Sequence, residues 1–306
     1  MPARCAVAVA PSPPTPVVAG AIAQGGGAVV DLPDAEALVW TDPFGAGDLR
    51  SLLDGAPGVK WVQLPFAGVE DFISLTDGRL TWTCAKGAYS EPVAEHALAL
   101  GLAGLRRLKA RARATTWGPA AGRRLMGERV VILGGGGIGQ ALIRLLRPFA
   151  VDVTVVKRTP GAVEGAGRVV GQDRLHDVLP GAALVVLALP LTPLTAGIVG
   201  AAELARMDGD AWLVNVARGG HVVTDDLVAA LLARAIGGAA LDVTDPEPLP
   251  DGHPLWDLDN CLITPHVSNT WEDMAQPLFA ARVRENLERY GRGAPLLGVV
   301  DPAAGY

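Results

Sequence analysis

V-V-I-L-G-G-G-G-I-G-Q, residues 130–140, is the stretch of the sequence that decides the fold. It joins an apolar, strand-like run to a G-x-G-x-x-G turn and then to the start of a helix. Gly134 permits the tight turn, Gly136 lets the backbone approach a pyrophosphate, and Gly139 permits close packing of the helix on the strand. The first N–H groups of the helix are available to phosphate oxygens. A glycine turn without a ligand is the alternative, but this context predicts a dinucleotide-binding domain.

Short apolar runs alternate with helical patterns beyond this stretch, which is typical of βαβ architecture. Six of these runs show little polar alternation, which is typical of strands in a parallel sheet that is covered on both faces. These predicted strands lie at 129–134, 151–156, 183–190, 211–216, 238–243 and 261–264. Helices are expected between most of them, at 138–149, 201–207 and 225–235.

The first third of the chain shows a similar but shorter pattern. Strands are predicted at 5–10, 37–40 and 61–64, and around Trp82 and Cys84. One long helix is expected at 91–113, with Ser90 as its N-cap, and another at 274–290. A length of 306 residues is in line with about two domains.

Composition and charge argue against several classes of partner. The net charge of −6 disfavours nucleic acid, and the basic run at 106–113 is typical of the solvated face of a helix. Three cysteines without C-x-x-C spacing indicate free thiols in a reducing compartment and suggest no metal site. Prolines interrupt the apolar run at 6–10, and no apolar stretch is long enough to span a membrane. We therefore expect a cytoplasmic protein.

The end of the second strand of the nucleotide domain bears on the choice of cofactor. An acidic residue at this place binds the ribose hydroxyls of NAD. Here the strand ends in Lys157, Arg158 and Thr159, which are suited to a 2′-phosphate because charge-assisted hydrogen bonds are strong. The sequence therefore favours NADP; the alternative is NAD, with both cations as ordinary surface charges.

Three charged or ionisable residues follow the later strands of the same predicted sheet. Arg218 lies in V-N-V-A-R-G, Glu247 in L-D-V-T-D-P-E-P, and His266 in I-T-P-H-V. An arginine binds a carboxylate with two parallel hydrogen bonds, and an imidazole beside a carboxylate can move a proton. Because ligands bind outside the carboxyl ends of parallel strands, these groups are candidates for a site that transfers hydride to a 2-oxo acid. Of the other histidines, His96 is expected to be structural.

These motifs together resemble the D-isomer-specific 2-hydroxyacid dehydrogenase family. The resemblance covers most of the chain from about Trp61, in the order G-G-G-G-I-G, L-P-L-T-P-L-T, V-N-V-A-R-G, L-D-V-T-D-P-E-P and I-T-P-H-V. It implies two Rossmann-like α/β domains with doubly wound parallel sheets. The cofactor domain (94–272) would be inserted into a flavodoxin-like substrate domain (1–93 and 273–306). It also implies a homodimer.

The resemblance assigns roles residue by residue. Arg218 would hold the substrate, His266 would be the acid–base, and Glu247 would pair with His266. The backbone N–H groups of Ala67 and Gly68 would bind the substrate carboxylate. Further contacts to the cofactor would come from Gly137, Ile138, Leu189, Pro190, Val216, Ala217 and Asp242.

Two functions remain open at this point. The first is NAD(P)-dependent reduction of a small 2-oxo acid, with glyoxylate or hydroxypyruvate as the closest guess. The second is a dinucleotide-sensing binding protein, because some relatives with this fold act as corepressors. Glu247 argues against the formate dehydrogenase branch, which lacks a carboxylate there. The residues that would contact the substrate side chain lie in loops whose shape the sequence does not determine.

Overall fold

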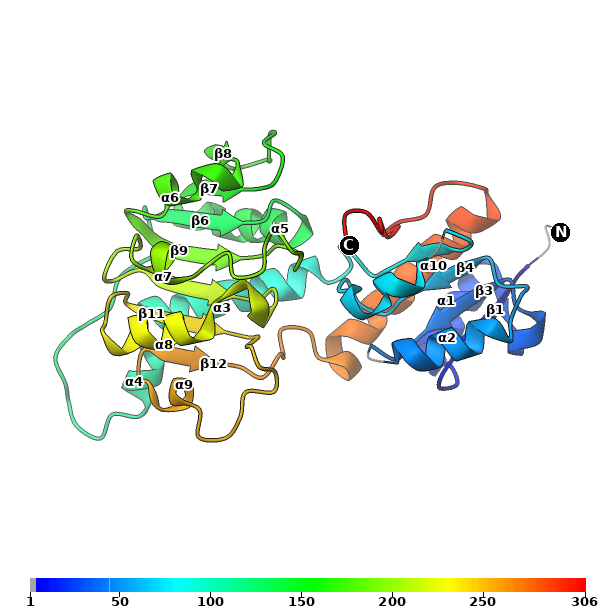
Figure 1. The fold of residues 1–306 in the computed structure, drawn as a ribbon, viewed down its shortest axis with the longest axis horizontal. Helices are drawn as coiled ribbons and strands as arrows, with labels where there is room; N and C mark the ends of the chain where they lie inside the picture. The colour runs from blue at the N-terminus through cyan, green and yellow to red at the C-terminus, as the bar shows by residue number, and fades with distance from the viewer. Residues whose placement is uncertain (1–3, 44, 77) are drawn as a thin grey trace. The chain divides into compact units, whose positions relative to one another are not determined.

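The computed structural model describes residues 4–43, 45–76 and 78–306 (Figure 1). The chain forms two compact units: unit 1 comprises residues 1–89 and 270–306, and unit 2 comprises residues 90–269. The change of unit thus falls at 89/90 and 269/270, whereas the sequence placed it at 93/94 and 272/273. Among the described residues, no helix has the length and apolar character needed to cross a membrane.

Unit 2 contains a seven-stranded sheet in the order β12-β11-β10-β9-β6-β7-β8, and every neighbouring pair is parallel. Its strands are β6 (Arg129–Leu133), β7 (Asp152–Val156), β8 (Arg168–Val170), β9 (Ala182–Leu187), β10 (Trp212–Asn215), β11 (Gly238–Leu241) and β12 (Cys261–Ile263). The chain builds outward from β6 through β7 to β8, then returns to β9 on the other side. This reversal of strand order between β6 and β9 is where doubly wound sheets bind their ligands.

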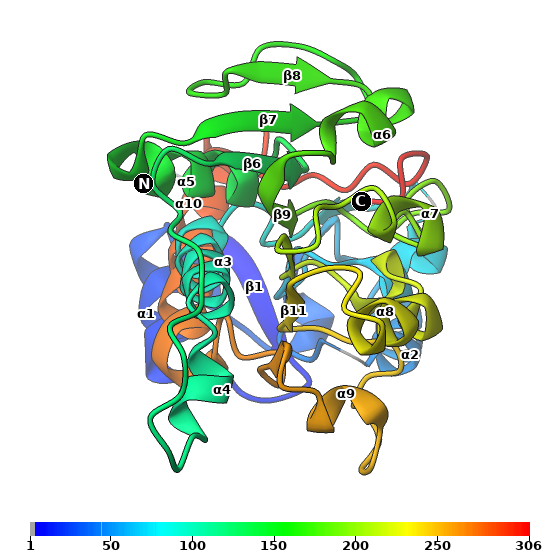
Figure 2. The same cartoon turned by 90° about the vertical axis from the view of Figure 1, so that its left-hand side faces the viewer.

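Helices cover both faces of this sheet (Figure 2). One face carries α3 (Ser90–Leu105) and α5 (Gly137–Leu146), which contact each other. The opposite face carries α6 (Leu175–Val178), α7 (Ala201–Leu204) and α8 (Thr224–Leu232). The strand β9 is buried along its whole length, as expected of a central strand that is covered on both sides.

Unit 1 contains a five-stranded parallel sheet in the order β2-β1-β3-β4-β5, the flavodoxin-like order. Its strands are β1 (Cys5–Ala10), β2 (Gly27–Val29), β3 (Ala37–Trp40), β4 (Trp61–Gln63) and β5 (Thr81–Thr83). On one face α1 (Pro16–Gln24) packs against α10 (Gln276–Gly291), and α2 (Ala46–Asp54) covers the other (Figure 2). The last segment of the chain thus completes a unit that the first segment begins. The predicted α/β class with two Rossmann-like parallel sheets is confirmed.

The long helix predicted at 91–113 is wrong as a single element. α3 ends at Leu105 and a short helix, α4 (Leu108–Ala112), follows, with Arg107 between them in the left-handed conformation at φ 53°. The carbonyl oxygen of Leu105 accepts a hydrogen bond from the N–H of Arg123 in the returning loop. Because that carbonyl bonds a distant residue, the break depends on a tertiary contact that no local pattern reveals.

Other differences concern short elements. The strands β2 and β8, of three residues each at the edges of their sheets, were not predicted. The helix expected at 274–290 is preceded by a π-helical turn, η6 (Trp271–Ala275), and α10 starts at Gln276. The helices predicted at 201–207 and 225–235 are shorter, at 201–204 and 224–232. The helix α9 (Pro254–Asp257) is a single turn before β12.

Candidate active site

The glycine-rich turn lies between β6 and α5 in the closely packed form that its sequence suggests. Gly134 has φ +116°, and a Cβ atom there would lie 2.0 Å from the carbonyl oxygen of Ala188 in the loop after β9. A Cβ atom at Gly139 would lie 2.1 Å from the carbonyl oxygen of Gly134. By contrast, a Cβ atom at Gly136, the N-cap of α5, would meet nothing within 4 Å. The turn is therefore tight against the protein at two glycines and open at the helix N-terminus, which suits a bound pyrophosphate.

The residues expected to contact the rest of the cofactor follow three other strands at the same edge. Lys157 is half-buried directly after β7, and its Cδ atom lies 3.4 Å from the position of a Cβ atom at Gly135. Arg158 and Thr159 are exposed beside it. The other predicted contacts follow β9 and β10: Leu189, Pro190, Val216 and Ala217. The lysine stem thus lies over the glycine turn, with two polar neighbours in solvent.

Arg218 lies in a turn after β10 that its neighbours hold in place. The buried Asn215 side chain donates to the carbonyl oxygen of Arg218 at 2.8 Å and accepts from the N–H of Ala217 at 3.0 Å. The fully buried His221 places Nδ1 2.9 Å from the same carbonyl oxygen of Arg218. The guanidinium donates to the carbonyl oxygen of Ala217 at 2.8 Å. These contacts fix the backbone at the base of the arginine.

Gly219 brings the Arg218 turn against the loop that carries Glu247. A Cβ atom at Gly219 would lie 1.9 Å from the carbonyl oxygen of Thr244, so only glycine fits between the two backbones. Thr244 in turn donates its N–H to Glu247 Oε2 at 3.3 Å. Gly219, the last residue of V-N-V-A-R-G, therefore lets two loops from neighbouring strands touch. Sequence reasoning missed this role.

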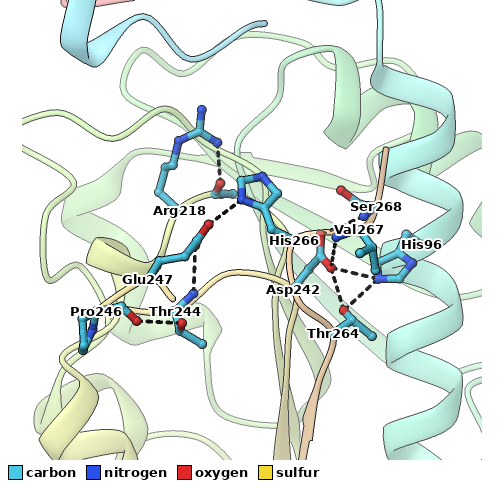
Figure 3. Close-up of polar contacts among 11 residues, drawn as sticks. His96, Arg218, Asp242, Thr244, Pro246, Glu247, Thr264, His266, Val267 and Ser268 are labelled. Atoms are coloured by element: carbon cyan, nitrogen blue, oxygen red, sulfur yellow. Dashed lines mark hydrogen bonds and ion pairs between the residues drawn. The ribbon is translucent and has the colours of Figure 1, made fainter. Parts of the chain in front are cut away.

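His266 and Glu247 are joined by a hydrogen bond at the edge of the sheet (Figure 3). His266 Nδ1 lies 2.6 Å from Glu247 Oε1, and both side chains remain partly exposed. The hydrogen bond from His266 lowers the pKa of Glu247 below its usual value of 4.5, against its partial burial. Because the carboxylate accepts the Nδ1 proton, the other ring nitrogen remains for a substrate oxygen.

Asp242 anchors the loop that carries His266. Its side chain is only 1 % exposed, and its carboxylate accepts the N–H groups of Val267 and Ser268 at 3.0 Å each and the hydroxyl of Thr264 at 2.6 Å. The backbone carbonyl of Asp242 accepts the N–H of His266 at 2.8 Å. Burial alone would raise the pKa of Asp242, but the hydrogen bonds from His96, Thr264, Val267 and Ser268 outweigh it and hold this pKa well below its usual value.

The hydrogen bonds to Asp242 are needed because the backbone of His266 is left-handed, with φ +52°. For a residue with a side chain, that conformation costs about 1–3 kcal/mol and persists only where surrounding contacts impose it. Three consecutive N–H groups, from residues 266 to 268, donate to Asp242. The loop is thus held at the angle that directs His266 towards Glu247.

The cysteines take no part in this arrangement. All three are free and buried. Burial raises the pKa of the Cys5 and Cys261 thiols to about 12, so neither carries a thiolate near neutral pH.

The structure brings most of the predicted residues to one edge of the unit 2 sheet. The glycine turn follows β6, Lys157 follows β7, Arg218 follows β10, and His266 follows β12. Ala67 and Gly68 belong to unit 1, where they lie in the loop after β4; Ala67 is exposed and Gly68 is partly buried. Asn215, Gly219 and His96 were not among the predicted site residues. The motif V-N-V-A-R-G contains the first two, but nothing in its spacing shows which groups they contact.

Comparisons with known proteins agree with this geometry. The model of the D-isomer specific 2-hydroxyacid dehydrogenase NAD binding domain matches residues 96–268. A glyoxylate/hydroxypyruvate reductase A from Photorhabdus laumondii is 30% identical over 282 residues, which covers 88% of this chain and 87% of the relative.

Two solved structures are similar over nearly the whole chain. A D-isomer specific 2-hydroxyacid dehydrogenase from Xanthobacter autotrophicus Py2, in complex with NADPH and MES, has a TM-score of 0.85 and 30% identity, and the match covers 99% of this chain and 100% of that one. An NADPH-dependent glyoxylate/hydroxypyruvate reductase from Sinorhizobium meliloti, in complex with NADP and sulfate, has a TM-score of 0.83 and 27% identity, with the same coverage. With the ordered motifs and the site at one sheet edge, these matches lead to one conclusion: the chain belongs to the D-isomer specific 2-hydroxyacid dehydrogenase family.

Proposed function

We propose that this protein reduces a small 2-oxo acid, of the glyoxylate or hydroxypyruvate kind, to the D-2-hydroxy acid with NADPH. The observation that carries the proposal is the 2.6 Å pair of His266 and Glu247 at the sheet edge that also holds the glycine turn. The relatives support it, since both the Photorhabdus and the Sinorhizobium proteins are named glyoxylate/hydroxypyruvate reductases.

The nicotinamide, when bound, supplies a hydride to the C2 carbon of the substrate. We assign the remaining work to this chain's own residues. Arg218 binds the substrate carboxylate and the C2 oxygen through its forked N–H donors. His266 holds a proton on Nε2 and releases it to the C2 oxygen as negative charge develops there. Glu247 keeps the ring oriented and favours its protonated form. In oxidation the same ring takes the proton back.

The residues present fit NADP. The open N-terminus of α5 offers first-turn N–H groups to the pyrophosphate, and no side chain obstructs the turn at Gly136. Lys157, Arg158 and Thr159 stand where an acidic residue would repel a 2′-phosphate. Ala67 and Gly68 of unit 1 are proposed to bind the substrate carboxylate through backbone N–H groups. Asp242, proposed by resemblance to lie near the nicotinamide, has its best-defined role in the anchor described above.

The preference for NADPH can be tested at Arg158. In Arg158→Ala we expect the KM for NADPH to rise about 10-fold, equivalent to about 1.4 kcal/mol, because one charge-assisted contact to the 2′-phosphate is lost. The KM for NADH should stay within about 2-fold, since NADH has no such phosphate. Steady-state kinetics with both cofactors measure the change.

A matched control is Arg168→Ala, which removes the same charge from an exposed position at the start of β8. It should leave both KM values unchanged. Equal rises for NADPH and NADH in Arg158→Ala would contradict the assignment of this arginine to the phosphate.

Glu247→Gln is expected to change the pH profile of reduction. Reduction needs a protonated imidazole, and the carboxylate stabilises that form. The pKa of Glu247 lies below 4.5 in the folded protein, so the wild-type carboxylate is ionised at every pH above that value. The loss of turnover in the variant should therefore be about 10- to 100-fold at pH values above 4.5. It should shrink as the pH falls through the lowered pKa of Glu247, because the wild-type carboxylate loses its charge there too. A loss that does not vary with pH would contradict the role of Glu247.

The reaction itself is tested with a panel of 2-oxo acids and both reduced cofactors, followed by the loss of absorbance at 340 nm. We expect turnover with glyoxylate or hydroxypyruvate and NADPH, and the D-isomer where the product is chiral. The other expectation, a dinucleotide-sensing binding protein, is less favoured because the named relatives are reductases. Tight NADPH binding without turnover of any 2-oxo acid would favour the dinucleotide-sensing binding protein instead.

We further propose that the protein is a homodimer in a reducing, cytoplasmic compartment. The support for the dimer is a group of exposed apolar side chains on and near the long loop after α4: Leu108, Trp117 and Met126. Trp117 is fully exposed, and an unpartnered tryptophan side chain is typical of an interface. Light scattering should give twice the chain mass, and Trp117→Ser should shift the equilibrium towards the monomer.

A further inference from the structure

His96 lies on α3, and it reaches the anchor of the His266 loop from another element (Figure 3). Its Nε2 atom is 3.0 Å from Thr264 Oγ1 and 3.3 Å from Asp242 Oδ1. Its side chain is 22% exposed, whereas that of Asp242 is 1% exposed. The ring thus contacts Thr264 and Asp242, the two side chains that hold the loop with His266.

The hydrogen-bond directions determine what His96 must supply. The Thr264 hydroxyl has one proton and donates it to Asp242 Oδ1, which also accepts the N–H of Val267. The oxygen atoms that face His96 are therefore both acceptors. Nε2 must carry a proton in either charge state of the ring, and His96 acts as a donor that completes the shell around a buried carboxylate.

The position of this contact in the chain adds to its importance. α3 begins at Ser90, the first residue of unit 2, and the anchored loop ends at Asn269, the last residue of that unit. The His96 contact therefore ties the first helix of the unit to its final loop. Without it, the donors to the carboxylate among the described residues would be Thr264 and the same loop that Asp242 restrains.

We propose that His96 is a positioning residue: through Thr264 and Asp242 it holds the left-handed turn that sets the angle of His266 against Glu247. This role rests on the proposed function, in which His266 is the acid–base. It assigns to a helix residue, 170 positions before His266 in the chain, a part in proton transfer without contact to substrate or cofactor.

The test compares His96→Leu with His96→Gln. Leucine removes the donor and keeps the bulk, whereas the glutamine amide nitrogen reaches about as far as Nε2 and keeps an N–H group. We expect kcat to fall about 100-fold in His96→Leu, the size typical of a misplaced catalytic group. The KM values for the 2-oxo acid and for NADPH should change less than about 3-fold. Glutamine should restore kcat to within about 5-fold of wild type.

Two further variants make the result specific. Thr264→Val breaks the same link from the strand side and should lower kcat in the same way, and it remains informative if His96→Leu does not fold. His176→Leu removes another histidine with a carboxylate partner, Glu203 at 2.6 Å, elsewhere in the same unit, and should leave kcat unchanged. An unchanged kcat in His96→Leu, or an equal loss with leucine and glutamine, would overturn the proposal.

Hydrogen exchange provides a readout that does not depend on activity. The amides of residues 266–268 donate to Asp242 and should be protected in the wild-type protein. In His96→Leu their protection should fall by at least about 10-fold, while that of β9 stays the same. If wild type reduces no 2-oxo acid but this protection still depends on His96, the proposed function fails and the anchor stands. If the protection is the same in both proteins, the anchor fails.

Discussion

Replacing His266 by alanine is expected to lower kcat for 2-oxo acid reduction roughly 10³-fold, within the range that general acid–base groups contribute. The ring is the group to which we assign proton transfer, and Glu247 holds it through Nδ1 at 2.6 Å. Binding of NADPH should remain within about 2-fold of wild type, because the glycine turn and Lys157 belong to other loops. Stopped-flow turnover and fluorescence titration of NADPH separate the two quantities.

The left-handed backbone at this position calls for a second variant. Alanine at φ +52° strains the loop by itself, whereas asparagine tolerates that conformation well. His266→Asn should therefore keep the loop and still lose turnover as His266→Ala does. A fully active His266→Asn would show that the imidazole is not the acid–base.

Arg218→Ala is expected to lower kcat/KM for the 2-oxo acid roughly 10³-fold. Removing one partner of a hydrogen-bonded charge pair costs about 2–5 kcal/mol. The side chain lies in a turn fixed by Asn215, His221 and Gly219, so the guanidinium starts from a well-placed backbone. Most of the loss should appear in KM if the arginine binds only the carboxylate, and also in kcat if it contacts the C2 oxygen as charge develops there.

Arg218→Lys separates charge from geometry. Lysine keeps the positive charge but lacks the planar fork, so we expect it to recover no more than about a tenth of the lost efficiency. Arg206→Ala, at an exposed position in the same unit, is the matched control and should be neutral. Wild-type efficiency in Arg218→Lys would mean that a point charge is enough, and would contradict binding through two parallel hydrogen bonds.

The reach of the sequence can be judged at the sheet of unit 2. Six of its seven strands were predicted from apolar runs, because a strand buried on both faces has few polar positions to blur the pattern. The seventh, β8, begins with the exposed Arg168 and has two apolar residues, too short a run to stand out. The break at Arg107 was missed for another reason: it depends on a hydrogen bond between Leu105 and Arg123.

The site divides in the same way. Arg218, Glu247 and His266 could be named from the sequence because each follows a strand of one parallel sheet, and parallel strands bring their carboxyl ends to one edge. The residues that orient these three side chains could not be named from the sequence. Asn215, Gly219 and His96 act through hydrogen bonds or close backbone approaches that join separate loops. Such contacts depend on distances that short motifs do not encode.

By itself, then, the sequence determined the parallel-sheet architecture and placed the glycine turn and the proposed reacting groups after strands of one sheet, because local pattern and strand order suffice for these. Only the tertiary structure decided how His266 is held. Its left-handed backbone, its 2.6 Å contact with Glu247, and the buried Asp242 with its donors on α3 and in the segment after β12 join residues from 96 to 268. The physical reason is that a buried carboxylate is stable only when donors surround it, and folding alone brings those donors together.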